Sequence, residues 1–272
     1  MQSRLIVIKS PRDIEMMRRA GMLAHEVLET MKRAVAPGIS TGEIDEIARI
    51  EMEKAGAQAL SKNYPKYKPG EGFPGYTCIS VNEVVVHGIP GPQKLKEGDI
   101  VTLDVALKLE GYCSDTAVTV PVGPISPELQ KLLDVTRQTL DLAINQIRPG
   151  KRWSEVARLV QYNVERNGFN MVREFVGHGI GREMHEEPKV PNFVTAEQLR
   201  ADFLLRRGMT LAVEPMVVMG SRDVDMLSDG WTIYTKDRMP AAHFEHTVAV
   251  TETGVDVLTD GRAPLPASAT GS

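Results

Sequence analysis

Residues 100–116, IVTLDVALKLEGYCSDT, constrain the fold more than any other stretch of this chain. Strand-forming residues run up to a turn signal at Glu110-Gly111, after which the chain returns, so the stretch is expected to form a β-hairpin. It carries Asp104 and Asp115, eleven residues apart and centred on the turn. Cross-strand neighbours on one face of a hairpin touch, so we expect these two carboxylates to lie opposite or nearly opposite each other.

Two like charges at such a distance are destabilising unless a cation lies between them. A carboxylate inside an apolar strand is also costly to bury. The hairpin alone is equally compatible with a polar stripe in solvent, since Thr102, Asp104, Ala106 and Lys108 share one face. The other acids and histidines of the chain decide between the two interpretations.

The composition is typical of a globular protein. Of the 272 residues, 42% are hydrophobic and 25% are charged, with a formal net charge of −4. No basic cluster indicates nucleic-acid binding, no apolar run has the ~18 residues of a membrane span, and the first residues do not form a secretory signal. The only cysteines, Cys78 and Cys113, are typical of a reducing compartment, so we expect a cytoplasmic protein. We expect residues 263–272 to form a disordered tail.

Helical periodicity and capping signals predict two pairs of helices. The predicted helices run from Ser10 to before Pro37, from Ser40 to Gly56, from Ser126 to before Pro149, and from about Ser154 to Gly168. A loop is predicted over 57–76, which is rich in proline, glycine and aromatic residues. Residues 78–86 are expected to form one strand that runs into a turn at 88–90.

The two helix pairs indicate an internal repeat. A shift of 112 residues superimposes the helix stops of the first pair on those of the second, and a shift of 110 places Asp104 on Glu214. We therefore predict a single domain over 1–262, built from pseudo-repeats at about 10–120 and 126–258. A site between two such halves would draw ligands from both.

Three more residues could join the hairpin aspartates. His178 lies among glycines in VGHGIG, Glu214 follows an apolar strand in LAVEPM, and Glu245 lies in a strand pattern in FEHT. Taken singly, each could be a turn residue or a strand-end acid in solvent. Together, four carboxylates and one imidazole would need about two divalent cations for charge balance. This oxygen-rich set does not resemble a structural zinc site and suits a two-metal hydrolytic centre.

Further histidines could polarise a carbonyl or hold its developing charge beside such a centre. His87 lies in VVHGIP and His185 in REMHEEP. His243 could be a neighbour of the site or merely polar, and we prefer the second interpretation.

The chain resembles the type I methionine aminopeptidases, which have the pita-bread fold. The matching motifs, in order, are SVNEVVVHGIP, GDIVTLDV, SDT, GHGIGREMHEEP, VEPM, DGWTIYTKDR and FEHTVAV. The resemblance implies an α+β fold in which two helix-helix-strand halves surround a central curved, mainly antiparallel sheet. It also implies a hydrolase that releases the N-terminal methionine from peptides and nascent chains and prefers a small second residue.

The same resemblance implies roles for single residues. Asp104 would bind one of two divalent ions, His178 and Glu214 mainly the other, and Asp115 and Glu245 would bridge them. Glu214 would also relay a proton. The ions could be Co, Mn, Fe, Zn or Ni.

On the substrate side, the resemblance implies that His185 contacts the scissile carbonyl and that His87 lies near the peptide nitrogen beyond it. Residues 60–76 are a few positions longer than in many bacterial relatives, and we expect an aromatic wall there. The residues implied to line the methionine pocket are Cys78, Trp231, Met184 and Phe73.

Two alternatives stay open on the same fold. One is an Xaa-Pro aminopeptidase or dipeptidase, although those relatives usually carry a separate N-terminal domain. The other is a non-catalytic binding protein, although such proteins typically lose metal ligands and all five are present here. We expect a monomer without nucleic-acid specificity or membrane attachment, with the ribosome as a candidate partner.

Overall fold

The computed structural model describes residues 5–65 and 72–262, so the tail predicted at 263–272 lies outside the described residues. The helices are α1 (Pro11–Ala34), α2 (Thr41–Lys54), α3 (Pro127–Gln146), α4 (Trp153–Arg166) and α5 (Ala196–Arg200). The strands are β1 (Gln58–Ala59), β2 (Cys78–Val81), β3 (Val84–Val86), β4 (Ile100–Leu109), β5 (Tyr112–Pro121), β6 (Asn170–Met171), β7 (Gly177–Gly179), β8 (Glu186–Val190), β9 (Thr210–Val213), β10 (Met216–Val218), β11 (Val224–Met226), β12 (Ile233–Thr235), β13 (Ala241–His243), β14 (Glu245–Val250) and β15 (Val255–Val257).

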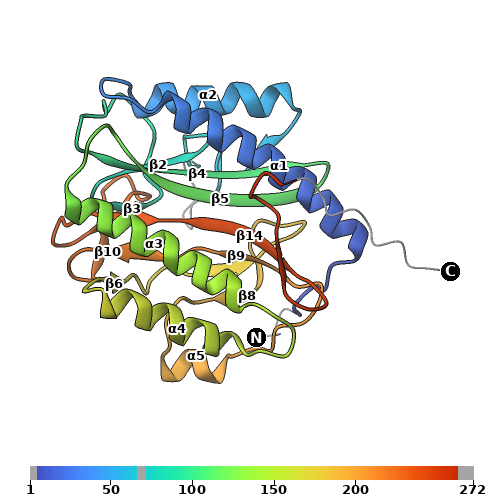
Figure 1. Cartoon of the computed structure of the whole chain (residues 1–272). Coiled ribbons are helices and arrows are strands. Elements are labelled where there is room, and N and C mark those ends of the chain that lie inside the picture. The colour runs from blue at the N-terminus through green and yellow to red at the C-terminus, as the bar shows by residue number, and fades with distance from the viewer. Residues whose placement is uncertain (1–4, 66–71, 263–272) are drawn as a thin grey trace.

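A curled, nine-stranded antiparallel sheet forms the centre of the molecule, which confirms the predicted α+β architecture (Figure 1). Its strands follow the order β1-β4-β5-β14-β9-β7-β8, with β2 paired to β4 and β15 paired to β14. Strands β1, β2, β4 and β5 come from the first half of the chain, and strands β7, β8, β9, β14 and β15 come from the second. The contact between β5 and β14 is therefore the seam at which the two halves of the sheet meet.

The predicted hairpin is present as β4 and β5. Glu110 and Gly111 have φ angles of 49° and 84°, and two such left-handed residues make the tight turn that suits the twist of a hairpin. The register pairs Asp104 with Ala117, and Asp115 with Ala106. The two aspartates are thus diagonal neighbours on one face, which is close to the arrangement expected from the sequence.

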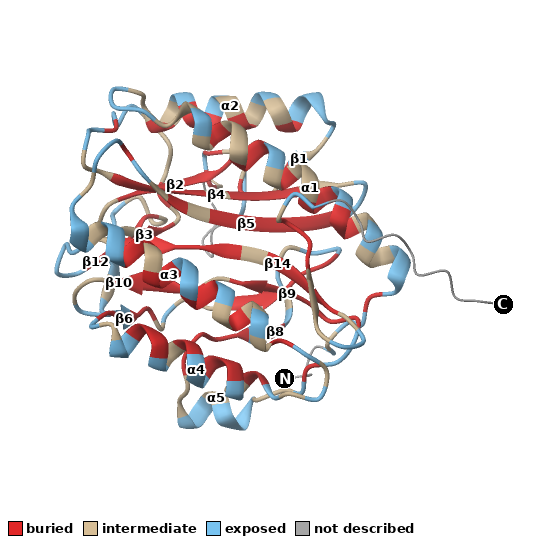
Figure 2. Ribbon diagram, in the orientation of Figure 1, coloured by how far each residue is buried: buried red, intermediate tan, exposed pale blue. Residues whose placement is uncertain are grey.

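Because side chains alternate along each strand, one face of the sheet is apolar and the opposite face carries the acidic residues. The odd-numbered residues of β4, from Val101 to Leu107, pack with α1 and α2 in one core, and β9 and β14 pack with α3 and α4 in a second core. All four long helices lie over this face, where the strands are buried beneath them (Figure 2). Asp104 has the opposite parity and faces away from the helices.

The helix starts follow the predicted capping signals. Ser10 with Asp13 and Ser40 with Glu43 form complete capping boxes, in which each side chain bonds the other residue's backbone N–H. The fourth helix starts one residue earlier than expected, at Trp153. These caps fix the ends of the helices that cover the sheet.

The prediction of one continuous strand over 78–86 was wrong. Asn82 has a φ of 51° and turns the chain between β2 and β3. Its side-chain amide donates to Asp99 Oδ1 at 2.9 Å and accepts from the Ile100 N–H at 3.0 Å. Asparagine tolerates the left-handed region better than most residues, so a local turn overrides the strand pattern. Strand β2 joins the main sheet, whereas β3 pairs with β12.

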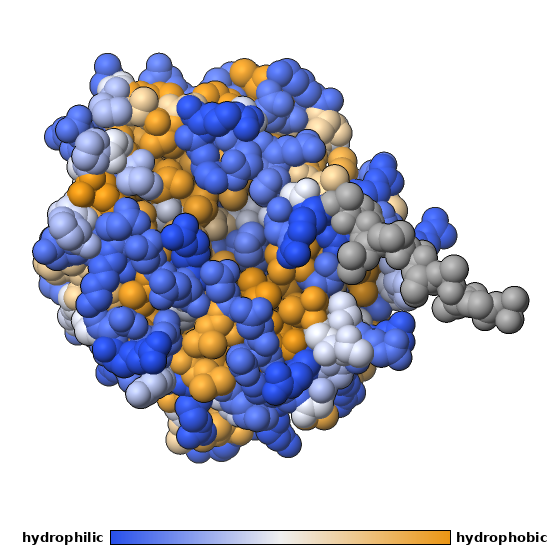
Figure 3. Space-filling model, viewed as in Figure 1, coloured by the Kyte–Doolittle hydropathy of each residue, from blue (hydrophilic) through white to orange (hydrophobic). Residues whose placement is uncertain are grey.

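The face that carries the helices is mainly hydrophilic, with apolar side chains visible between the helices (Figure 3). Within residues 5–65 and 72–262, no helix is both long enough and apolar enough to cross a membrane.

Substitution of Gly21 by alanine is predicted to destabilise the protein, although alanine is the better helix former. A Cβ atom at Gly21 would lie 2.1 Å from the carbonyl oxygen of Leu258, so α1 would have to move off the C-terminal segment. We expect Gly21→Ala to lower the free energy of unfolding by about 1–3 kcal/mol, measured by urea denaturation. Glu15→Ala on the exposed side of α1 is the control, and an unchanged or raised stability in Gly21→Ala would contradict this packing.

Candidate metal centre and substrate pocket

Acids from both halves of the chain meet at the seam of the sheet. Across it, Glu245 of β14 pairs with Ala117 of β5. The pairing is reinforced by side chains, since the Thr116 hydroxyl donates to the Glu245 carbonyl at 2.9 Å and the Thr247 hydroxyl donates to the Asp115 carbonyl at 2.8 Å. The backbone thus holds Asp115 and Glu245 on neighbouring strands.

Asp115, His178 and Glu245 lie close enough to hold one metal ion. Each offers a ligand atom, and these atoms all lie within 4.8 Å of one another. His178 Nε2 lies 3.6 Å from Glu214 Oε1 and 3.9 Å from Asp115 Oδ2. Asp104 is hydrogen-bonded to Asp115, so the structure brings together all five residues predicted to form the centre.

Burial and mutual repulsion perturb every carboxyl group in this cluster. Burial raises the pKa of Asp104 to about 7, against the effect of its hydrogen bond to Asp115. Burial and the charge of Asp104 raise the pKa of Glu214 to about 8. Burial, followed by the neighbouring carboxylates, raises the pKa values of Asp115 and Glu245 well above the usual range. The protein alone therefore disfavours the four charges that the residue types would carry.

Unpartnered atoms in the cluster fit a divalent cation. Asp115 Oδ1 and Glu245 Oε1 are buried and make no hydrogen bond within the described part of the chain, which is costly unless another partner binds them. His178 Nδ1 lies 2.9 Å from the carbonyl oxygen of Gly179, which can only accept, so Nδ1 carries the proton. The Nε2 lone pair then faces the acids, as in a metal-ligating histidine whose other nitrogen is hydrogen-bonded.

His243 lies beside the cluster, contrary to our preferred interpretation of it as merely polar. Its side chain is buried, and Nε2 lies 3.9 Å from Glu214 and 3.8 Å from Glu245. Neither ring nitrogen has a hydrogen-bond partner among the described residues. Period-two alternation from Glu245 to residue 243 was the signal that could have revealed it. His246, of the other parity, instead bonds the Thr259 hydroxyl at 2.8 Å.

Of the residues predicted to line the methionine pocket, Cys78 lies beside an acid, and Phe73 and Trp231 contact each other. Cys78 is the β-sheet partner of Asp104. The rings of Phe73 and Trp231 meet edge to face with centroids 5.4 Å apart. Such a wall of aromatic rings and a thiol suits an apolar side chain. Met184 is half-buried, and its place in the pocket stays a prediction.

The two histidines predicted on the substrate side lie in separate loops. His87 follows β3 with a φ of 58°, and its ring packs edge to face against Phe175 with centroids 5.4 Å apart. His185 precedes β8 and is exposed, and its ring centroid lies 4.4 Å from that of His178. The ring of His185 is therefore close to the acid cluster and open to an incoming molecule.

A buried ion pair supports the loop that carries His185. Glu186 pairs with Lys9, which is itself buried, from the segment before α1. The same carboxylate accepts hydrogen bonds from the backbone N–H groups of Arg182 at 2.9 Å and Glu183 at 3.3 Å. Glu186 thus joins the 182–186 loop to the segment before α1 and also closes the loop on itself.

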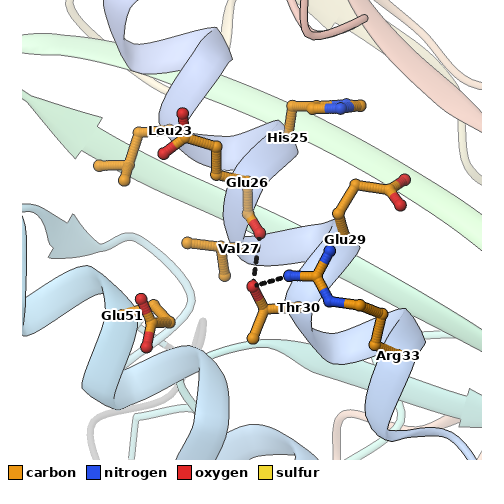
Figure 4. A pocket seen from close by; sticks show the side chains of 8 residues that line it. All are labelled: Leu23, His25, Glu26, Val27, Glu29, Thr30, Arg33 and Glu51. Carbon is orange, nitrogen blue, oxygen red and sulfur yellow. Dashed lines mark hydrogen bonds between the residues drawn. The ribbon is translucent and has the colours of Figure 1, made fainter.

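A hollow of about 370 Å³ on the surface of α1 and α2 is a separate feature (Figure 4). It is lined by His25 and by charged side chains such as Glu26, Glu29 and Arg33. None of the five predicted metal-binding residues contributes to it. The dashed lines mark two surface hydrogen bonds: the Arg33 guanidinium donates to the Thr30 hydroxyl, and this hydroxyl donates to the Glu26 carbonyl.

Comparison with known proteins shows the family to which the chain belongs. Residues 15–252 match metallopeptidase family M24. Methionine aminopeptidase 1 of Bacillus subtilis is 45% identical over 94% of this chain and 99% of that protein, and the methionine aminopeptidase of Escherichia coli is 42% identical over 93% and 94%. The crystal structure of the methionine aminopeptidase from Thermotoga maritima superposes with a TM-score of 0.88 at 41% identity, covering 94% of this chain and 99% of that one.

The chain therefore belongs to metallopeptidase family M24, and the family and the buried cluster together indicate divalent-metal binding. A prolidase from Pyrococcus horikoshii shares the fold with a TM-score of 0.74, but it is 21% identical and only 65% of its chain is covered. Within the family, the chain belongs to the type I methionine aminopeptidases, which are metal-dependent hydrolases of the pita-bread fold. Neither the Xaa-Pro peptidase nor the non-catalytic alternative is favoured.

Metal-free protein is predicted to lose stability between pH 6.5 and pH 8. Asp104 and Glu214 have folded-state pKa values of about 7 and about 8, above their ordinary values, so the folded state holds protons that the unfolded state releases. Their contribution is full at acidic pH and is lost as pH rises through these values. His87 and His178, with pKa values lowered to about 4 by burial, change stability in the opposite sense, and this effect fades as pH rises above 6.5.

The measurement is the thermal unfolding midpoint of chelator-treated protein at pH 6.5 and pH 8. It should fall with pH, and added Mn²⁺ should abolish the fall because a cation stabilises the ionised carboxylates. The Asp104→Asn variant should show a smaller fall. A midpoint that rises or stays constant in metal-free protein would contradict the proposed charge cluster.

Proposed function

We propose that the chain hydrolyses the peptide bond after an N-terminal methionine, in peptides and in nascent proteins. The relatives, methionine aminopeptidases at 41–45% identity, support this activity. The observation that carries it is the buried meeting of Asp115, His178, Glu214 and Glu245 at the seam. We propose that Cys78, Phe73 and Trp231 add an apolar recess for one side chain to this metal centre.

Two divalent ions per chain are the proposed cofactors. Asp104 would hold one ion, His178 and Glu214 the other, and Asp115 and Glu245 both. When bound, such ions supply an acidic water and polarise a carbonyl oxygen. Four carboxylates balance the charge of two divalent ions, which is the charge argument for two. Ligand type does not choose among Co, Mn, Fe, Zn and Ni, because affinity follows the general order of these metals.

The protein's own residues would orient the substrate and move its protons. Glu214, ionised once cations are bound beside it, would accept a proton from water and pass it to the leaving amine. His185 would donate to the scissile carbonyl oxygen, and His87 would lie near the peptide nitrogen beyond it. The substrate's free amine would bind at the metal centre, which restricts cleavage to the first residue.

Specificity would come from the pocket lined by Cys78, Phe73, Trp231 and Met184. A tight apolar pocket discriminates by about 1–3 kcal/mol for each methylene group. We also keep four broader expectations: one catalytic domain over 1–262, a monomer, a cytoplasmic location where nascent chains are found, and contact with the ribosome.

Cleavage should depend on the second residue of the substrate. Met-Ala-Ser should be hydrolysed at least about a hundredfold faster than Met-Lys-Ser, because we expect the site to accept only a small second residue and to clash with a long one. The assay is methionine release by chelator-stripped protein supplied with Mn²⁺, Co²⁺ or Fe²⁺. Equal rates, or no release with any metal, would refute the proposal, whereas cleavage of Xaa-Pro peptides alone would favour the prolidase alternative.

His185→Ala should slow methionine release without loss of metal. Removal of one donor to a developing oxyanion lowers kcat by about 10²–10³-fold. Elemental analysis should show unchanged metal content, whereas His178→Ala should reduce it. Wild-type turnover in His185→Ala would refute the assigned role, and loss of its metal would place His185 among the ligands instead.

A further inference from the structure

Tyr64 contacts His185 through both its hydroxyl and its ring. The hydroxyl oxygen lies 3.0 Å from Nδ1 of His185, and the two rings meet edge to face with centroids 5.7 Å apart. Tyr64 is neither a metal-ligand candidate nor one of the predicted pocket residues. No role assigned above therefore explains the contact of Tyr64 with His185.

The backbone around Tyr64 is held in place by the pocket wall. The Tyr64 N–H donates to the Ser61 carbonyl at 2.9 Å, and the Tyr64 carbonyl accepts from the Phe73 N–H at 3.1 Å. The Asn63 N–H donates in turn to the Phe73 carbonyl at 2.9 Å. Because Phe73 is almost fully buried, at 2% exposed, these bonds fix the backbone of Tyr64 beside Phe73.

The two neighbouring histidines have different partners at Nδ1. In His178, Nδ1 faces a carbonyl, which can only accept, and Nε2 is left with its lone pair toward the acids. In His185, Nδ1 faces a phenol, which is able to donate. A neutral imidazole has one donor and one acceptor nitrogen, so opposite partners at Nδ1 would produce opposite tautomers in the two rings.

We propose that Tyr64 is a positioning residue that donates its hydroxyl proton to Nδ1 of His185 and thereby fixes the tautomer with a proton on Nε2. The inference rests on the proposed function, because it assigns a role in the same hydrolysis. A ring with Nε2–H donates a hydrogen bond to the carbonyl oxygen of the scissile bond, whereas the other tautomer presents a lone pair that repels this oxygen. Tyr64 acts on the substrate only through His185.

Tyr64→Phe tests the hydroxyl while keeping the ring. We expect kcat on Met-Ala-Ser to fall about fivefold to tenfold, the effect of one lost hydrogen bond, with KM changed by less than about twofold. Metal content should stay the same. Tyr162→Phe, at a position 63% exposed on α4, is the matched control and should leave both constants unchanged.

A double-mutant cycle distinguishes positioning from a general structural effect. In a His185→Ala background, Tyr64→Phe should cause no further loss of kcat, since the ring that it orients is gone. Equal losses in both backgrounds, or wild-type kcat in Tyr64→Phe, would overturn the inference. If the inference fails, the proposed function still holds provided that wild-type protein releases methionine and His185→Ala releases it slowly. If wild-type protein releases no methionine, both the proposed function and the inference are refuted.

Nitrogen NMR of the histidine rings gives a readout that does not depend on activity. The signals of His185 are assigned by their loss in His185→Gln. Metal-free wild-type protein should carry the His185 proton on Nε2, and Tyr64→Phe should show a mixture of tautomers. A proton on Nδ1 in wild-type protein would overturn the inference, because the phenol would then be the acceptor.

Discussion

Repulsion among four buried carboxylates is the constraint on which the rest of the structure depends. Two unit charges 4 Å apart repel by about 4 kcal/mol at the effective dielectric typical of proteins. Asp104, Asp115, Glu214 and Glu245 are all drawn into one region, where burial alone already opposes their ionisation. A chain that keeps such a cluster needs a positive partner there, and divalent cations supply the charge in the smallest volume.

The fold supplies the rigidity that holds these charges together. Each half of the chain packs two helices on one face of its strands and leaves the other face for polar side chains. The β5–β14 pairing then joins the halves, so that acids far apart in sequence become neighbours. Bonds from Thr116 and Thr247 across the seam fix the backbone directly beside the acids. The metal centre is therefore built on strands, and the substrate-side histidines lie on the loops between them.

Much of this arrangement could be predicted from local patterns. The hairpin of β4 and β5 follows from alternation and the Glu110-Gly111 turn, and its register brings Asp104 close to Asp115 without any tertiary information. The starts of α1, α2 and α3 follow from serine caps. Local periodicity does not say which strands pair across a seam. Predicting that the two halves meet therefore required the internal repeat and the family resemblance.

The features that the sequence did not reveal are those set by short or long-range contacts. The break at Asn82 depends on bonds to Asp99 and Ile100, and strands of two or three residues such as β6 and β7 are too short to show a period. The position of His243 follows from strand parity, but its isolation from hydrogen-bond partners is a property of the packed site. The contact of Tyr64 with His185 joins residues 121 positions apart, which no local pattern encodes.

Anomalous X-ray diffraction from crystals grown with Mn²⁺ would decide whether the acids at the seam bind metal, because it locates the ions without reference to activity. We expect two strong peaks at the seam, each within ligand distance of three or more of Asp104, Asp115, His178, Glu214 and Glu245. Peaks elsewhere, or none at a Mn²⁺ concentration that supports methionine release, would show that these carboxylates converge for some reason other than binding metal.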